Sequence, residues 1–354
     1  YGGYSSLVYA TGILGGMIAD RYLGYQRSII LGGLLMAVGC FTLLSPEIHL
    51  FLIGLAVIVA GNGLFKPNIS TMVGKLYAPG DVRRDSGFTI FYMGINAGAF
   101  VAPLITAVWI GANYGYKYGF LAAAIGMIFG IAVFQVRKGM LGHVGKSPAG
   151  REGWGPVLNV LVGAILLVPV IYFLLSQSEI LGVVLLALFA GLAVYLIWSG
   201  YSETSVQGQK YIAMFLLFTA NILFWALFEQ AGASLNFLAQ DHVNAPFHFT
   251  LFQSANPLFI VLLAPVFAMM WPWLDKMNMN PSIPRKFAIA LIGMAAGFAL
   301  LVFALKNFLG PDDRIGWYWL AGLYLIHTMA ELCLSPIGLS MVTKLAAPKN
   351  VGLS

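Results

Sequence analysis

Three charged side chains lie well inside long apolar stretches of the sequence: Lys66, Glu229 and Glu331. A charge at the centre of a membrane helix costs about 2.5–3.5 kcal/mol or more, so such a residue is retained for a role. Two carboxylates against one ammonium suit a site that accepts a proton or an external cation. The alternative is a set of structural ion pairs that ties helices together.

Helix-breaking residues accompany these charges. They are Pro67 after Lys66, Gly232 after Glu229, Pro257 after Asn256, and Pro336 and Gly338 after Glu331. Breaks in membrane helices line cavities, because the carbonyls that they release need polar partners. We therefore expect irregular backbone and a cavity at these positions. Asn96, between Gly94 and Gly98, is a further candidate for a hydrogen bond in that cavity. The small residues Gly94, Gly98, Gly111 and Gly115 suit close helix packing.

His327 precedes Glu331 by one helical turn, on the same face. This spacing allows a proton relay, and it equally fits a partly buried histidine near the outer end of its helix. None of these residues has the spacing of a hydrolase triad, a zinc site or a phosphate-binding loop. The sequence therefore predicts no enzyme, no metal site and no organic cofactor.

The segments that carry these residues are long and apolar. Hydrophobic residues make up 60% of the chain and charged residues 9%, which excludes a water-soluble domain. The apolar residues form blocks of about 17–25, the length that crosses a bilayer as a helix. Eleven blocks are predicted: 3–19, 28–45, 50–73, 86–111, 115–136, 156–175, 179–199, 211–238, 250–273, 286–306 and 317–343.

The basic residues indicate orientation. The net charge of +6 does not reflect nucleic-acid binding, because Lys and Arg form no cluster on a polar module. Taking alternate loops, fifteen of them lie on one side, and three, Lys117, Lys306 and Arg314, lie on the other. The richer side is cytoplasmic by the positive-inside rule. It comprises Arg21, Arg27, Lys75, Arg83, Arg84, Arg137, Lys138, Lys146, Arg151, Lys210, Lys276, Arg285, Lys286, Lys344 and Lys349.

The glycine-rich loop from Arg137 to Trp154 has the composition of a linker and divides the spans into two groups. Apart from Glu179 at the start of the second, the two spans that follow it contain no acidic or basic residue, which favours a lipid-facing structural hairpin over a substrate path. The chain starts at Tyr1 without an initiator Met and stops soon after Lys344. We therefore expect at least one further helix upstream and more downstream.

One loop resembles a known signature. The stretch GGMIADRYLGYQR (residues 15–27) is similar to the loop motif of the major facilitator superfamily. In that superfamily the acid and base that match Asp20 and Arg21 tie helix ends together.

Four further stretches resemble one branch, the proton-dependent oligopeptide transporters. They are GLFKPNIS (63–70), FYMGINAGAFVAPL (91–104), FWALFEQAG (224–232) and ELCLSPIGL (331–339). The resemblance runs along the whole chain and implies an all-α integral membrane protein with the major facilitator fold, two helical bundles plus an extra two-helix hairpin between them.

The resemblance also implies domains and missing parts. The implied parts are an N-terminal bundle at 1–136 (helices two to six of the family), a cytoplasmic linker at 137–155, the extra transmembrane hairpin at 156–200, and a C-terminal bundle at 201–354 (helices seven to ten). The family's first helix, with its ExxER stretch, and its last two helices have no match in these 354 residues.

The resemblance assigns roles to individual residues. Lys66 matches a lysine that binds the peptide carboxylate and takes part in proton coupling, and Glu331 matches the glutamate that receives the peptide amino group. Glu229 matches a proton-linked gate residue. The remaining implied contacts to the peptide are Asn96, Asn256 and Tyr9, with Trp225 as a residue of the wall.

These inferences predict a proton-coupled symporter that imports di- and tripeptides across the bacterial inner membrane by alternating access. Its partners are the peptide, protons and the lipid bilayer, and the proton is the coupling ion. Two alternatives stay open. One is a carrier of nitrate or another small anion, and the other is a peptide sensor that does not transport.

Overall fold

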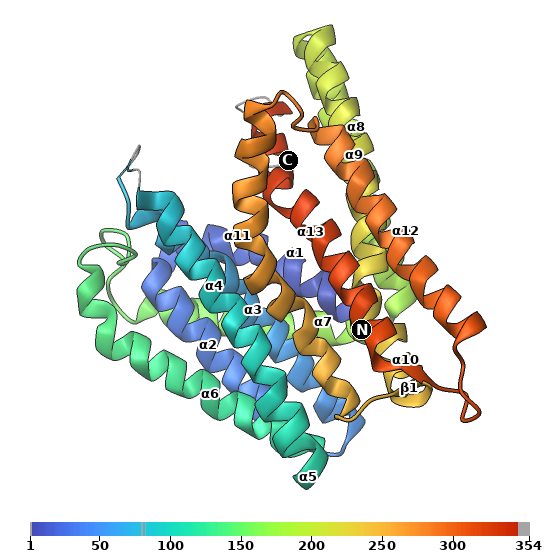
Figure 1. Ribbon diagram of the computed structural model, residues 1–354. Helices are drawn as coiled ribbons and strands as arrows, with labels where there is room; N and C mark the ends of the chain where they lie inside the picture. Colours follow the sequence, from blue (N-terminus) through green and yellow to red (C-terminus); the bar gives the residue numbers. More distant parts are fainter. Residues whose placement is uncertain (1, 79–80, 82, 346–354) are drawn as a thin grey trace. The chain divides into compact units, whose positions relative to one another are not determined.

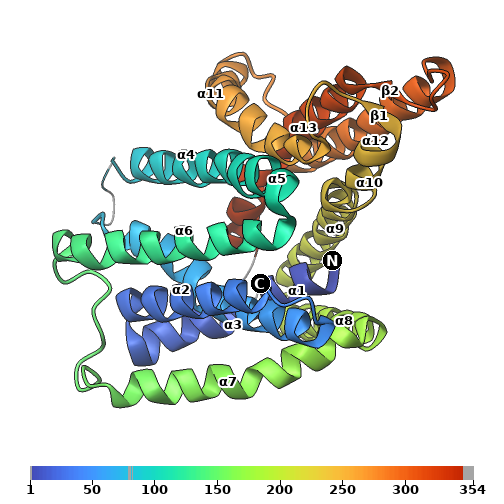
Figure 2. The same ribbon diagram turned by 90° about the horizontal axis from the view of Figure 1, so that it is seen from below.

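Helices form almost the whole structure, a computed structural model that describes residues 2–78, 81 and 83–345 (Figures 1 and 2). All eleven predicted spans are helical. The long helices are α1 (Gly2–Ile18), α2 (Tyr25–Thr42), α3 (Ile48–Lys75), α4 (Arg83–Pro103), α6 (Tyr116–Arg137), α7 (Gly155–Ser176), α8 (Ser178–Glu203), α9 (Ser205–Phe228), α11 (Ala255–Lys276), α12 (Ile283–Asn307) and α13 (Trp317–Leu345). Nine helical stretches within the described residues are long and apolar enough to cross a membrane.

Two predicted spans contain changes of helix type. The span that begins with α4 continues through a π-helix (Leu104–Gly111) into the short α5 (Ala112–Tyr114). The span that begins with α9 passes through a 3₁₀ turn (Glu229–Gly232) into α10 (Ser234–His242). The predicted irregularity at Glu229 is therefore confirmed.

The other predicted breaks differ from expectation. A 3₁₀ segment (Phe249–Ser254) ends just before Asn256. Pro257 lies in the first turn of α11, where proline costs no helical hydrogen bond because backbone N–H groups in the first turn have no acceptor within the helix. At Lys66 the expectation was wrong, because α3 runs through Pro67 without interruption. At Glu331 the expectation was also wrong, since α13 stays helical past residues 336 and 338. The side chains of these two residues, and Lys349 as a whole, lie outside the described part of the structure. Neighbouring helices compensate for such residues in membranes.

The chain divides into two compact units. Unit 1 comprises Tyr1–Ile95 and Leu104–Val184, and unit 2 comprises Asn96–Pro103 and Leu185–Ser354. The boundaries fall inside α4 and α8, so that α7 belongs to unit 1 and most of α8 to unit 2.

In unit 1, α1 and α2 both pack on α3 through glycines. A Cβ at Gly15 would overlap the carbonyl of Gly63, and a Cβ at Gly61 would lie 2.6 Å from the carbonyl oxygen of Gly32. The absence of side chains thus lets the three backbones touch. The close packing predicted for Gly94, Gly98 and Gly115 is not seen, because each faces open space within the described residues. At Gly111 the space is filled, since a Cβ there would lie 2.7 Å from the Tyr116 ring.

The N-terminus of α3 is capped by an acidic side chain. The Glu47 carboxylate accepts hydrogen bonds from the backbone N–H of Leu50 (2.8 Å) and of His49 (3.0 Å). These two donors stabilise the ionised form and hold the pKa of Glu47 below its usual value.

The loop after α6 is docked on the start of α2 and is not an extended tether. It begins with a 3₁₀ turn (Lys138–Leu141). Gln26 then donates from its backbone to the carbonyl of Gly145 (2.9 Å) and from its side chain to that of Val144 (2.7 Å). Further along, Arg27 donates to the carbonyl of Gly153 at 2.7 Å.

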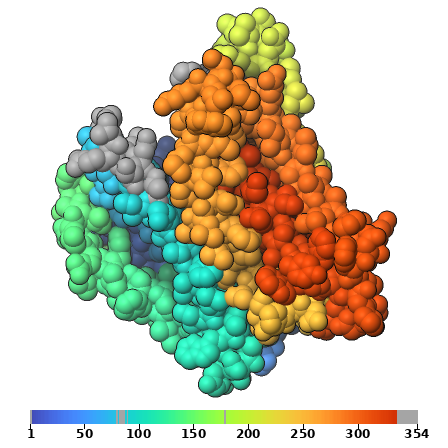
Figure 3. Space-filling model, viewed as in Figure 1, coloured from blue at the N-terminus to red at the C-terminus, as the bar shows by residue number. Residues whose placement is uncertain are grey.

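Unit 2 is built around α9, α12 and α13. Its main core contains Tyr211, Phe224, Met294 and Leu334. A second core lies beside a two-residue parallel pairing between β1 (Val243–Asn244) and β2 (Ile315–Gly316). Figure 3 shows the segments around β1 and β2, in yellow-orange and red-orange, as one continuous surface at the lower right.

Candidate functional site

Lys66 and Tyr9 lie together in unit 1. The Lys66 ammonium is 4.4 Å from the centre of the Tyr9 ring, which is a cation–π distance. Both side chains are exposed in the described chain. The contact between α1 and α3 brings them together, so two residues assigned separately by the family resemblance are neighbours in the fold.

Asn68 holds α3 against α1 just beyond Lys66. It is fully buried, and its Nδ2 donates to the carbonyl of Gly15 on α1 (3.1 Å) and to that of Leu64 (2.8 Å). The bond to Gly15 fixes the rotation of α3 where Lys66 leaves the helix. An asparagine inside an apolar helix is visible in the sequence, but Asn68 was not among the predicted site residues.

Glu331 and Asn256 form the second pair, in unit 2. Glu331 on α13 is 7% exposed, and its Oε2 accepts a 2.7 Å hydrogen bond from Asn256 Nδ2 at the start of α11. The same Nδ2 is 3.1 Å from the hydroxyl oxygen of Thr328. A buried carboxylate requires such donors, because burial without them costs far more than the bond contributes.

Glu229 and Trp225 mark the point where α9 stops. Trp225 packs edge-on against Phe224 and Phe228, with ring centres 5.5 and 5.2 Å apart. Glu229 follows as the first residue of the 3₁₀ turn and is partly buried. Both residues belong to unit 2, on successive turns of one helix end.

Asn96 is buried on α4, within the part of that helix that belongs to unit 2. The hydroxyl of Ser254 donates to the carbonyl of Phe100 at 2.8 Å, which ties this part of α4 to the segment before Asn256. Lys66 and Tyr9 thus belong to unit 1, whereas Glu331 and Asn96 belong to unit 2.

Asp20 and Arg21 lie in a π-helical turn (Ala19–Leu23) between α1 and α2. The Tyr25 hydroxyl donates to Asp20, and the Lys75 ammonium is 4.6 Å from the centre of the Tyr25 ring. Tyr25 therefore contacts both the turn after α1 and the last turn of α3. Asp20 and Lys75 also line a cavity of about 840 Å³.

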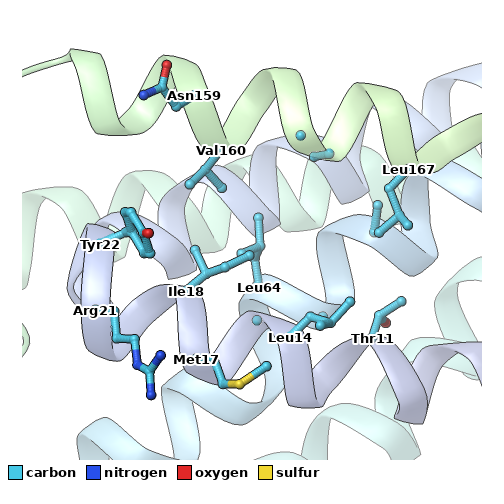
Figure 4. A pocket seen from close by; sticks show the side chains of 15 residues that line it. Thr11, Leu14, Met17, Ile18, Arg21, Tyr22, Leu64, Asn159, Val160 and Leu167 are labelled. Atoms are coloured by element: carbon cyan, nitrogen blue, oxygen red, sulfur yellow. The ribbon is translucent and has the colours of Figure 1, made fainter.

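Arg21 lines a different cavity, of about 540 Å³, between α1, α3 and α7 (Figure 4). In that view Ile18, Leu64 and Val160 point into the space between the helices, and the Arg21 guanidinium points away. The walls are mostly apolar, and of the predicted site residues only Arg21 lies on them. This cavity is therefore unsuited to a charged substrate.

His327 contacts α12. It is buried, its Nε2 lies 3.2 Å from the carbonyl oxygen of Met294, and its ring packs on Phe298 with centres 5.0 Å apart. These contacts favour the buried-histidine interpretation over the proton relay.

Two buried polar residues were not among the predicted site residues. Thr328 is fully buried and lies one helical turn before Glu331. The three-residue spacing could have indicated it, because residues three apart share one face of a helix. Lys286, counted only for orientation, is buried with its ammonium 4.0 Å from the centre of the Trp271 ring.

Comparison with known proteins identifies the family. The model of the POT family matches residues 26–354. The peptide transporter YePEPT of Yersinia enterocolitica is 35% identical, over 99% of this chain and 73% of that protein. A di-/tripeptide transporter of Lactococcus lactis is 36% identical, over 97% of this chain and 73% of its own length.

Solved structures of similar proteins also match this chain. A peptide transporter POT in complex with sulfate matches with a TM-score of 0.83 and 37% identity, over 99% of this chain and 74% of that one. A POT family transporter in complex with a thioalcohol-conjugated peptide matches with a TM-score of 0.81 and 30% identity, over 99% of this chain and 75% of that one.

The predicted fold class is confirmed: this is an all-helical, multi-pass membrane protein with the major facilitator fold. Its bacterial relatives agree with the predicted location in a bacterial inner membrane. With a family model that covers most of its length and relatives above 30% identity along nearly all of it, the chain belongs to the POT family.

Proposed function

We propose that this chain is part of a proton-coupled symporter that imports di- and tripeptides across the bacterial inner membrane. The observation that carries the proposal is the buried Glu331 carboxylate, held in place by Asn256. The named functions of the relatives, a peptide transporter and a di-/tripeptide transporter, support the substrate class.

Glu331 suits the amino end of a peptide. A carboxylate offers about four acceptor positions, and the Asn256 bond occupies one of them. An ammonium brings three donors and the opposite charge, so that it both neutralises the carboxylate and fills further positions. Such a bond is strong because Glu331 is shielded from water.

Lys66 suits the carboxylate end. Its ammonium is exposed, and the face of the Tyr9 ring steadies it through cation–π attraction. This contact uses the charge without using an N–H donor on a hydrogen-bond acceptor, so the donors remain suited to an incoming carboxylate.

Glu229 is our candidate for proton coupling, with Lys66 as a second participant. Glu229 lies where α9 changes to a 3₁₀ turn, a junction at which a change of charge alters local backbone geometry easily. Inward movement of a proton supplies about 2.3 kcal/mol per 100 mV of membrane potential. The proton is the only coupling ion in this proposal.

The substrate assignment is tested by competition in proteoliposomes that contain the full-length protein under an imposed proton gradient. Dipeptides with both ends ionised should compete for uptake of a labelled dipeptide. N-acetylated or C-amidated analogues should compete about 5- to 150-fold less well, because each leaves a charge without its partner, at about 1–3 kcal/mol. Equal competition by blocked peptides would overturn the assignment.

Single variants test the two charges. Lys66→Ala and Glu331→Gln should abolish gradient-driven uptake, while the exposed controls Lys117→Ala and Glu47→Gln should keep it. Normal uptake by Lys66→Ala or Glu331→Gln would return that residue to a structural role. Uptake of nitrate in place of dipeptide would support the anion-carrier alternative, and binding of dipeptide without uptake would support the sensor.

Proton coupling is tested with Glu229→Gln, which mimics the protonated side chain. The variant should still exchange labelled for unlabelled dipeptide across the membrane without a gradient, because exchange needs no net proton movement. Accumulation against a gradient should be lost. A variant that still concentrates dipeptide, or that loses exchange together with binding, would show that Glu229 is not the coupling residue.

A further inference from the structure

The side-chain amide of Asn256 makes two hydrogen bonds through the same nitrogen. Nδ2 donates to Glu331 Oε2 at 2.7 Å and to Thr328 Oγ1 at 3.1 Å. An amide NH₂ has two N–H groups, so both of its donors are used by these neighbours on α13.

Thr328 can receive this bond only as an acceptor. Its own O–H donates to the carbonyl of Tyr324, one turn earlier, at 2.7 Å. A hydroxyl has one hydrogen, which is thereby used, and the lone pairs of the oxygen face Asn256. Thr328 is fully buried, so water does not take over either contact.

The opposite orientation of the amide is disfavoured by the same geometry. Turning it over would place Oδ1 2.7 Å from a carboxylate oxygen and 3.1 Å from a hydroxyl whose hydrogen is engaged elsewhere. Both contacts would then join acceptor to acceptor. Neither of the two observed hydrogen bonds uses Oδ1.

We propose that Thr328 is a positioning residue, which orients the Asn256 amide so that Nδ2 holds Glu331 and Oδ1 serves as a second acceptor for the substrate's ammonium. The inference rests on the proposed function of Glu331. It adds a specificity device, because a protonated amine offers several donors, whereas an N-acetylated end offers one and no charge.

The test is dipeptide uptake by Thr328→Val, which keeps the shape of the side chain and removes the hydroxyl. The half-saturation concentration should rise about tenfold, equal to about 1.4 kcal/mol, with the maximal rate within about twofold of the original. The preference for a free over an N-acetylated dipeptide should shrink by a similar factor. Thr328→Ser, which retains the acceptor, should restore both values.

A matched control is Thr219→Val on α9, whose hydroxyl makes the same bond to a carbonyl one turn earlier, that of Phe215 at 3.0 Å. It should leave half-saturation unchanged. Thr328→Val should also have no further effect in an Asn256→Ala background, because the residue acts through Asn256. If the valine variant does not fold, Thr328→Cys, a weaker acceptor of similar size, should raise half-saturation several-fold.

Unchanged half-saturation in Thr328→Val, additive effects with Asn256→Ala, or a serine variant as impaired as the valine variant would overturn the inference. Those results leave the proposed function intact if the original protein still prefers peptides with a free amino end. Loss of that preference in the original protein would instead overturn the proposed function.

Discussion

Two adjacent glycines on α1, Gly15 and Gly16, are predicted to respond in opposite ways to the same substitution. A Cβ at Gly15 would overlap the Gly63 carbonyl and lie 2.9 Å from the backbone nitrogen of Leu64. At Gly16 no atom of the described residues lies within 4 Å of that position. The pair therefore compares one methyl group in two environments on one helix.

The magnitude follows from two opposing effects. Replacing Gly by Ala inside a helix contributes about 1 kcal/mol of stability, and this gain applies to both positions. At Gly15 the methyl meets the backbone of α3, which no side-chain rotation can relieve, so the cost is at the upper end of about 1–3 kcal/mol for overpacking. Gly15→Ala should therefore lose about 2 kcal/mol, and Gly16→Ala should gain about 1 kcal/mol.

The measurement is the thermal unfolding midpoint of each purified variant in the same detergent at one heating rate. With about 2–4 °C per kcal/mol, Gly15→Ala should unfold about 4–8 °C lower and Gly16→Ala about 2–4 °C higher than the original. Because α1 also carries Tyr9 beside Lys66, dipeptide uptake should fall in the first variant only. Equal midpoints for the two variants would refute the proposed contact between α1 and α3.

Three further outcomes are expected. Glu47→Ala should lower the unfolding midpoint at neutral pH. Because folding lowers the pKa of Glu47, the stabilisation by its carboxylate is full above the unfolded-state pKa of about 4.3 and is lost as the pH falls through the folded-state pKa. A difference in midpoint that persists at low pH would contradict the capping role. Arg27→Ala should speed protease cleavage of the loop after α6 about fivefold, because the bond to the Gly153 carbonyl is lost; an unchanged cleavage rate would argue against docking of that loop. Gly297→Ala should lower the unfolding midpoint by the equivalent of about 1–3 kcal/mol, because the added methyl group would lie 2.5 Å from the buried His327 ring. An unchanged midpoint would show that the ring moves easily.

Hydropathy and charge predicted the helices because both act along the chain. A bilayer requires about 20 apolar residues in a row, and that requirement can be read locally. The eleven spans were found this way. The irregular backbone at Glu229 was predicted from Gly232, which follows within one turn. The short motifs, from the loop at Asp20 to the stretch at Glu331, were sufficient to identify the family.

The sequence could not show which side chains meet across helices. Gly94 and Gly98 have the spacing of a packing motif, yet close backbone contacts are found between Gly15 and Gly63 and between Gly32 and Gly61. Spacing along one helix defines a face, and only the neighbouring helix decides whether that face is in contact.

The partners of the buried polar groups were decided in the same way. Asn256 and Glu331 are 75 positions apart, and the hydrogen bond between them exists because α11 and α13 pack together. The sequence by itself determined that a carboxylate is placed inside a membrane helix, and the family resemblance indicated what it binds. The tertiary structure decided which amide holds that carboxylate and that Thr328 orients the amide, because hydrogen bonds depend on distance and direction in space and not on separation along the chain.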